Sequence, residues 1–357
     1  MFFSAARTPL VSGQPSKIEV AKTRHRAVKP IKRSEDRWIG IDIGGTKTRL
    51  DLFDEAFHII HSIRVKTGKD ATYFKRQLIK STGELIKAGG PHHPVSGIGV
   101  GFAGSVTNKG LVESAPNLRA LEGFPLKKVL SNFTVGDVVV SNDVHAAMYG
   151  ELKLGAAVGC QHALGVFIGT GIGGAIVSNG KLHLGASGHA GNIGHYLLQP
   201  YGAPARSERH GILDEVASRV AIAGSAASFA AKEWAPHLLK RAGTDIRKIK
   251  SSDLAASIQA GDKAVEELVR SRARIVGIVL SNLVDFFNPE IVVLGGGLTD
   301  AMPKLIRDEV AAGIIDHSTS EARRGLRIVC SKLKGHSATT GAARLACEAA
   351  ASSRLAA

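Results

Sequence analysis

The stretch from Val138 to Val177 restricts the fold more than any other part of this chain. An apolar strand is expected to end at Asn142-Asp143, a helical run follows, and a second apolar strand ends at the glycine-rich segment 169–174. This strand–helix–strand order is typical of an α/β protein. It places a carboxylate at one strand end and, at the next, a turn whose bare backbone amides can bind phosphate. The stretch therefore predicts an α/β fold suited to phosphoryl transfer.

The hairpin around this turn occurs twice in the chain. The apolar run 38–42 predicts a strand that leads into a glycine–threonine turn, and a second strand returns within the segment 42–53. The segment 164–177 repeats this order of strand, glycine–threonine turn and returning strand. Apolar runs predict further strands at 59–65, 98–102 and 291–294. Three consecutive strands at the start fit the antiparallel beginning of a mixed sheet. The duplication predicts two related domains that face each other.

Length and composition exclude several classes of protein. The 357 residues are enough for two domains, the hydrophobic fraction of 44% is that of a soluble globular protein, and no apolar run reaches the length of a membrane span. Cys160, Cys330 and Cys347 are far apart and lack metal-ligand spacing. They predict free thiols in a reducing, cytoplasmic compartment, and no membrane partner is expected.

The net charge of +15 is carried in part by the first residues. The segment 1–36 is basic, contains three prolines and shows no apolar periodicity, so it predicts a disordered basic tail. It has no signal-peptide core, although an organellar transit peptide stays open as an alternative. It also lacks the pattern of two packed helices, so a helix-turn-helix domain and a specific nucleic-acid partner are not expected.

Glycine turns follow three of the predicted strands and can meet at one edge, where open α/β sheets bind nucleotides. None of them has the P-loop pattern, which needs a Gly-Lys-Ser/Thr run that opens a helix. The segment 171–174 lacks the Rossmann spacing and leads into a strand. The sequence therefore argues against a dinucleotide site.

Six short motifs occur in order along the chain. They are Asp42–Lys47, Gly99–Gly104 with Ala115–Asn117, Asn142–Ala146, Gly169–Gly174, Gly194-His195, and Asn288-Pro289 with Gly295–Gly297. In this order they resemble the motifs of the ROK family (repressors, open reading frames, kinases), whose sugar kinases belong to the actin-like ATPase superfamily. The resemblance covers about residues 38–350, nearly all of the chain that is expected to be ordered.

The resemblance implies two ribonuclease H-like (actin-like ATPase) α/β domains with mixed sheets around a central cleft. The implied divisions are the basic tail at 1–36, a smaller N-terminal domain at 37–142 and a larger C-terminal domain at 143–357. The last helix, expected at 338–354, is a candidate to return to the N-terminal domain.

The resemblance also implies a role for each motif. Asp143 would be the general base that accepts the proton of a sugar hydroxyl. Asp42 would orient Mg²⁺, largely through water. The sugar would be bound by Asn117, Asn142, Asn192, His195 and Asp214. The nucleotide would be bound by Asp42, Gly44, Gly45, Thr46, Lys47, Gly169, Thr170, Gly171, Gly173, Gly296 and Gly297. Taken singly, the acids and asparagines could only cap a helix or shape a turn, and the neighbouring motifs favour function.

One departure from the family pattern concerns the sugar. The family's Gly-Glu-Ile-Gly-His segment has Asn192 in place of its glutamate. An amide accepts hydrogen bonds but is neutral and also donates, so the acceptor sugar is expected to be unusual or more weakly bound. Asp214 falls where a sugar-binding glutamate is usual, although a shift of one residue would place Glu215 there.

A second departure concerns zinc. The cysteines of the family's zinc segment align with Ala205, Ser207 and Ile212, none of which can bind zinc. His195 is then left without thiolate partners, so no structural zinc is expected.

The implied function is that of an ATP-dependent, glucokinase-like sugar kinase. It would transfer the γ-phosphoryl group to a hydroxyl of a hexose or hexose derivative, with ATP and Mg²⁺ as cofactors. Two alternatives stay open. Some zinc-free relatives use polyphosphate, and the basic charge here keeps a polyphosphate-dependent glucokinase-type enzyme in view. A catalytically weak, sugar-binding regulatory protein is the other. Dimers are usual in the family, so a homodimer also stays open.

Overall fold

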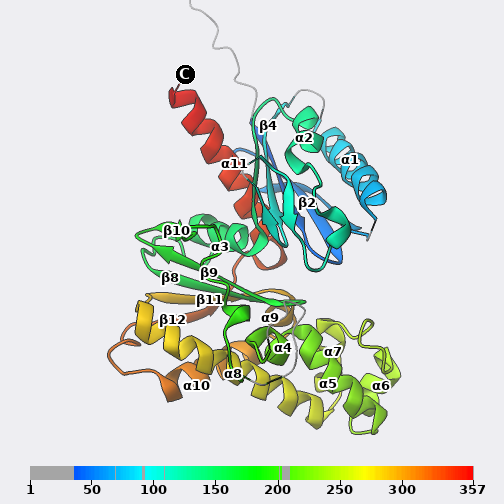
Figure 1. Cartoon of the computed structure of the whole chain (residues 1–357), viewed down its shortest axis with the longest axis vertical. Coiled ribbons are helices and arrows are strands. Elements are labelled where there is room, and N and C mark those ends of the chain that lie inside the picture. The colour runs from blue at the N-terminus through cyan, green and yellow to red at the C-terminus, as the bar shows by residue number, and fades with distance from the viewer. Residues whose placement is uncertain are drawn as a thin grey trace, which may run out of the picture. The chain divides into compact units, whose positions relative to one another are not determined.

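The computed structural model describes residues 36–68, 70–90, 93–107, 109–200, 202 and 210–356 (Figure 1). The predicted tail at 1–36 lies almost wholly outside the described residues, as do Ala205 and Ser207 of the segment aligned with the zinc motif. From residue 36 onward the described chain belongs to one compact unit with two five-stranded sheets. No helix within these ranges is long and apolar enough to cross a membrane.

The first sheet has the strand order β3-β2-β1-β4-β7. Its strands are β1 (Arg37–Ile43), β2 (Lys47–Phe53), β3 (Ile59–Lys66), β4 (Val95–Phe102) and β7 (Val138–Asn142). The first three pair antiparallel, whereas β4 runs parallel to both β1 and β7. A small separate hairpin consists of β5 (Ser105–Val106) and β6 (Val112–Ser114).

The second sheet, of order β10-β9-β8-β11-β12, repeats this plan. Its strands are β8 (Ala163–Ile168), β9 (Ile172–Ser178), β10 (Lys181–His183), β11 (Ile291–Gly295) and β12 (Arg327–Cys330). Again three consecutive strands pair antiparallel, and two later strands add in parallel. The mixed α/β fold with two related sheets, predicted from the sequence, is confirmed.

Helices flank both sheets. They are α1 (Ala71–Ala88), α2 (Leu126–Leu130), α3 (Asp143–Leu154), α4 (Leu213–Ala217), α5 (Arg219–Ala231), α6 (Pro236–Ala242), α7 (Ser251–Gln259), α8 (Lys263–Phe287), α9 (Gly297–Ala301), α10 (Pro303–His317) and α11 (Ser337–Ala356). α1 begins where Asp70 accepts a hydrogen bond from the Tyr73 amide at 2.6 Å. Its residues Phe74, Leu78 and Leu85 lie at helical spacing and are buried in the core of the first sheet.

Glycines allow α11 to pack on the first sheet at backbone distance. A Cβ at Gly40 of β1 or at Gly99 of β4 would lie 1.9 or 1.8 Å from a backbone oxygen of α11. α11 also crosses α3, where a Cβ at Gly341 would lie 1.7 Å from the Ala146 oxygen. The C-terminal helix therefore contacts β1, β4 and α3 (Figure 1).

A buried carboxylate, that of Glu151, fixes the C-terminal part of α3. Glu151 is fully buried and accepts hydrogen bonds from the hydroxyls of Ser331 and Ser337 at 2.6 and 2.8 Å. The backbone amides of Lys332 and Leu333 donate to it as well, at 3.1 and 3.0 Å. Because its oxygens are satisfied in this way, the charge can remain buried. α3 is thus tied to the segment that joins β12 to α11.

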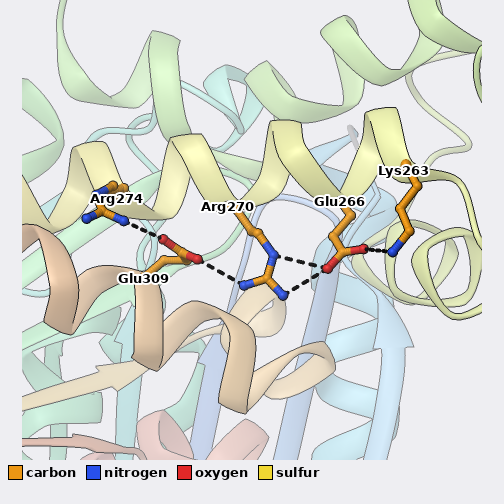
Figure 2. A network of polar contacts seen from close by, with 5 residues as sticks. All are labelled: Lys263, Glu266, Arg270, Arg274 and Glu309. Carbon is orange, nitrogen blue, oxygen red and sulfur yellow. Dashed lines mark hydrogen bonds and ion pairs between the residues drawn. The ribbon is translucent and has the colours of Figure 1, made fainter.

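In the second half, α8 and α10 pack closely side by side. A Cβ at Gly277 of α8 would lie 2.3 Å from a backbone oxygen of α10. Figure 2 shows the ion-pair ladder along these two helices, formed by Lys263, Glu266, Arg270, Arg274 and Glu309. Its basic side chains are half-exposed or exposed, so each pair is expected to stabilise the fold by less than about 1 kcal/mol.

The structure differs from the sequence-based expectations in its short elements. The turn predicted at 169–174 is shorter, because β9 already begins at Ile172 and Gly173 therefore lies in a strand. The strands β5, β6, β10 and β12 have two to four residues each and were not predicted. The domain divisions at 37–142 and 143–357 stay a prediction.

Candidate active site

The carboxyl groups of Asp42 and Asp143 come to the same edge of the first sheet. Asp42 of β1 pairs with Gly101 of β4, and β7, next to β4, ends at Asn142 directly before Asp143. A Cβ at Gly101 would lie 3.2 Å from the Cα of Asp143, so the glycine lets the start of α3 approach the sheet closely. The structure therefore brings together the residue expected to orient a metal ion and the residue expected to act as base.

Asn142 caps the helix that carries Asp143. Its Oδ1 accepts hydrogen bonds from the amides of Val144 and His145 at 2.9 and 3.2 Å. The carboxylate of Asp143 accepts from the Val144 amide at 3.0 Å, in the first turn, where the helix N-terminus favours negative charge. The oxygen of Asn142 is thus occupied by the helix, whereas its NH₂ group is 3.5 Å from the Gly104 oxygen.

Burial raises the pKa of both carboxyl groups. The pKa of Asp143 rises to about 6 because desolvation disfavours the charged form, although the hydrogen bond from Val144 acts in the opposite direction. The pKa of Asp42 rises to about 7, first through burial and then through the charge of Asp143, while Arg49 and Arg64 lower it. A carboxyl group with a pKa near 6 is suited to accept a proton near neutral pH.

The first glycine turn, residues 44–46, packs against Asn117. The hydroxyl of Thr67 donates to the Gly44 carbonyl at 2.7 Å and helps to fix the turn. A Cβ at Gly45 would lie 3.0 Å from the Cβ of Asn117, so the loop after β6 lies directly on the turn. The exposed side chains here are those of Thr46 and Lys47. A residue predicted to bind sugar therefore adjoins residues predicted to bind phosphate.

The second glycine turn, residues 169–171, is held by a carboxylate from another element. Oδ1 of Asp214, in α4, accepts a hydrogen bond from the Ile172 amide at 2.5 Å. Behind the turn, a Cβ at Gly173 would lie 2.4 Å from Cγ2 of Val144 in α3. The sequence assigned Asp214 to the sugar and Gly173 to the nucleotide. The structure gives Asp214 a contact that shapes the turn, and Gly173 a close packing contact with α3.

A hydrogen bond links the segment 184–195, which includes Asn192, to the start of α3. Nε2 of His145 is 3.0 Å from the Ala190 oxygen, and burial lowers the pKa of this histidine, so the neutral ring donates this bond. Asn192 is exposed and directly precedes the 3₁₀ turn η3 (Ile193–His195). Two further residues predicted to bind sugar, Asn192 and His195, therefore lie on a segment bonded to the helix of the candidate base.

The residues predicted for the adenosine side lie beside the second turn. Gly296 has a φ of +86°, and a Cβ there would lie 2.5 Å from the Ile168 oxygen. Only glycine combines this backbone conformation with such a close approach. Gly297 begins α9, and a Cβ there would lie 3.7 Å from the hydroxyl of Ser251, at the start of α7.

Sequence reasoning missed Arg219 at this turn. Its Nη2 is 3.4 Å from the hydroxyl of Thr170, within the second glycine turn. No motif marks this arginine, which follows the segment aligned with the zinc motif by only a few residues. A basic residue at a helix start is an unfavourable choice for the helix dipole, and this was the one signal available.

The structure also bears on zinc. Among the described residues, no group of three or more His, Cys, Asp or Glu side chains could hold a metal ion. Ile212 of the aligned segment is buried, whereas Ala205 and Ser207 lie outside the described part of the chain.

Comparison with known proteins assigns the family. The ROK family model matches residues 38–349. A glucokinase of Halalkalibacterium halodurans is 31% identical over 284 residues, which cover 76% of this chain and 84% of that protein. A glucokinase of Thermotoga maritima is 28% identical and covers 86% of this chain and 96% of its own length. The crystal structure of a ROK family glucokinase from Streptomyces griseus, in complex with glucose and AMPPNP, matches with a TM-score of 0.77 at 29% identity, over 87% of this chain and 99% of that one. The chain belongs to the ROK family.

Proposed function

We propose that this glucokinase-like ROK sugar kinase uses Asp143 as the general base when it transfers the γ-phosphoryl group of ATP to a hydroxyl of glucose or a related hexose. The observation that carries this proposal is the position of Asp143. It is the first residue of α3, beside Asp42, on a helix that also packs against the hairpin of the second glycine turn. An acceptor hydroxyl and a phosphate chain could therefore meet at one helix end.

The comparisons support the choice of substrates. The Streptomyces griseus relative was crystallised with glucose and a non-hydrolysable ATP analogue, AMPPNP. In this chain Asn117 and the segment 184–195 would contact the sugar, whereas the two glycine turns and Gly296 would contact the nucleotide. Asp143 would take the proton of the attacking hydroxyl, and backbone amides of the turns would stabilise charge on the transferred group.

Asp42 fits the Mg²⁺ that a kinase of this class requires. Its carboxyl group is half-buried and makes no hydrogen bond within the described part of the chain. A buried carboxyl group without a partner is costly to ionise, and a divalent cation nearby would favour its charged form. Mg²⁺ would supply neutralisation of phosphate charge when it is bound, and Asp42 would hold it directly or through water.

A panel of sugars tests the proposal. Glucose, mannose, N-acetylglucosamine and N-acetylmannosamine would each be incubated with the full chain, MgATP and a coupled assay for ADP, and the product would be identified by mass spectrometry. We expect turnover with at least one hexose, and its loss in Asp143→Asn. If no sugar is phosphorylated but one of them binds, the chain is a sugar-binding regulatory protein instead.

One observation favours polyphosphate as a second phosphoryl donor. Lys47 lies directly opposite Lys66, and Arg49 opposite Arg64, on the paired strands β2 and β3. Like charges in such positions destabilise a sheet. Within the described chain, Lys47, Arg64 and Lys66 form no ion pair, and the charge of Arg64 is the main cause that lowers the pKa of Lys47. A polyanion would relieve this repulsion.

This basic face, formed by Lys47, Arg49, Arg64 and Lys66, is tested by replacing ATP with inorganic polyphosphate in the same assay. Polyphosphate-dependent turnover that falls more than ATP-dependent turnover in Arg64→Ala would support the second donor. Turnover with ATP but none with polyphosphate would exclude polyphosphate as a second donor.

Two further expectations belong with this proposal. A homodimer stays open as an alternative to a monomer, and light scattering after size-exclusion chromatography would distinguish the two. A cytoplasmic location is predicted as well, and fractionation of the source cells would test it.

A further inference from the structure

Arg219 joins the second glycine turn to the segment before α7. Its backbone amide donates to the Gly169 oxygen at 3.0 Å, and its Nη2 is 3.4 Å from the hydroxyl of Thr170. Its Nη1 donates to the Ile249 oxygen at 3.1 Å. The same segment continues to Ser251, which faces Gly297. The guanidinium group therefore lies between the segments predicted to bind the phosphates and the adenosine of the donor.

All the acceptors of this guanidinium group are neutral. Among the described residues no carboxylate pairs with Arg219, although the side chain is half-buried and burial lowers its pKa. Elsewhere in the described chain, half-exposed arginines such as Arg241 and Arg270 form ion pairs with Asp253 and with Glu266. Removing a charge from water without an opposite charge is unfavourable, so the position of Arg219 calls for an anion.

A second cation, Lys250, lies close to this segment in the sequence, and its ammonium group donates to the Arg247 oxygen. Lys250 directly follows Ile249, and its charge contributes to the lowered pKa of Lys47 in the first hairpin. Lys250, which directly precedes α7, and Lys47 of β2 are therefore within each other's electrostatic field. Mutual repulsion of this kind is unfavourable for the protein alone, and an anion between the two ammonium groups would remove it.

We propose that Arg219 binds the phosphate chain of the donor nucleotide and so completes the phosphate site at the second glycine turn. The inference rests on the proposed kinase function and adds a binding residue to it. Arginine has five N–H donors, of which two are used by Thr170 and Ile249, so the others can meet phosphate oxygens. Its planar fork suits phosphate better than an ammonium group does.

The test is a series of affinities rather than a rate. Binding of adenosine, AMP, ADP and ATP to the full chain would be measured by calorimetry in the wild type, Arg219→Ala and Arg219→Gln. We expect adenosine to bind within twofold of the wild type in both variants. We expect the loss to grow with the number of phosphates and to reach about ten- to a hundredfold for ATP, the range of a lost charge-assisted hydrogen bond.

The matched control is Arg307→Ala on α10, where the exposed arginine pairs with Asp308 and should leave all four affinities unchanged. An equal loss for adenosine and ATP would overturn the proposal, because Arg219 would then only hold the segment before α7 in place. Unchanged ATP affinity would overturn it as well. Arg219→Gln keeps donors for Ile249 and Thr170, so it preserves the test if the alanine variant does not fold. A wild type that binds ATP in this way but phosphorylates no sugar would leave Arg219 in place and refute the kinase assignment instead.

Discussion

The two glycine hairpins occupy equivalent places in their sheets but obtain their carboxylates differently. In the first, Asp42 belongs to the hairpin's own strand, and its carboxyl group makes no hydrogen bond within the described residues. In the second, no acid stands at the end of β8, and Asp214 comes from α4 to accept a hydrogen bond from the Ile172 amide. The same backbone plan therefore carries an unbonded carboxyl group in one copy and a bonded one in the other.

This difference separates a carboxyl group that is available for chemistry from one that supports the fold. A half-buried carboxyl group without partners is unfavourable for the fold and available to a ligand, whereas one that accepts a short hydrogen bond from a backbone amide stabilises its turn. Each hairpin also has a different cation nearby. Lys47 belongs to the first hairpin itself, and Arg219 reaches the second from α5. The first hairpin thus takes its carboxyl group and its cation from its own strands, and the second takes them from elements distant in sequence.

The largest effect is expected at Asp143, which lies between the two hairpins. Asp143→Asn should lower kcat about a hundredfold to ten-thousandfold, because the attacking hydroxyl loses its base. Sugar affinity should change little, since the amide keeps the size of the side chain and the cap by Asn142 is intact. Steady-state kinetics and sugar calorimetry measure both. Near-normal turnover would show that the base lies elsewhere.

Asp42→Asn should lose activity and gain stability. The folded-state pKa is about 7 against an ordinary value of 3.8, so ionisation opposes folding and stability falls as pH rises through about 7. At pH 8 the variant should therefore unfold with a free energy larger by about 1–2 kcal/mol, whereas at pH 4 the two proteins should be nearly equal. Urea unfolding at both pH values measures this. A less stable variant at pH 8 would mean that Asp42 supports the hairpin after all.

The pH profile sharpens the assignment of the base. Burial holds the pKa of Asp143 at about 6, and only the ionised form accepts a proton. At saturating Mg²⁺, which keeps Asp42 ionised, turnover in the acidic range should therefore fall about tenfold per pH unit below 6 and be level between pH 7 and 8. The profile of kcat/KM reports the free enzyme and is the one to compare. If turnover falls only below about pH 4, then water in the site keeps the pKa of Asp143 near its ordinary value, or another group limits the rate.

Asp214→Ala, unlike Asp42→Asn, should lower the stability of the fold. Loss of the hydrogen bond to the Ile172 amide should lower the free energy of unfolding by about 1.5–3 kcal/mol and raise KM for ATP through a looser turn. Glu215→Ala is the matched control, since the side chain of Glu215 makes no hydrogen bond or ion pair within the described chain. If Glu215→Ala instead abolishes sugar binding, the sugar-binding acid is Glu215 and not Asp214.

Local sequence predicted the long strands and the turns because each has a strong signal of its own. The apolar run 98–102 and the segments 42–53 and 164–177 fall within or across observed strands, and Asn142-Asp143 marks the change from β7 to α3. These positions depend on neighbours in the chain, so periodicity and turn residues suffice.

Contacts between distant segments could not be predicted in this way. The bond from the Ile172 amide to Asp214 spans 42 residues, and Arg219 reaches Thr170 over 49. The strand β12 has four residues and owes its place to pairing with β11. Nothing in the local composition of such segments specifies a partner, because tertiary packing decides it.

The smallest expected effect concerns Asn192, the position where the chain departs from its family. Asn192 is exposed, beside the segment bonded to His145, and it would meet the sugar as a neutral group that both donates and accepts. Asn192→Glu restores a carboxylate that only accepts. Because hydrogen bonds to charged groups contribute about 1.5–3 kcal/mol and neutral ones about 1, kcat/KM for glucose relative to the native substrate should rise by about one order of magnitude. The comparison is a panel of sugars in both proteins, with Asn179→Glu on an exposed turn as control. An unchanged ranking of the sugars would mean that Asn192 does not select the substrate, and the choice of sugar would then rest with Asn117 and His195.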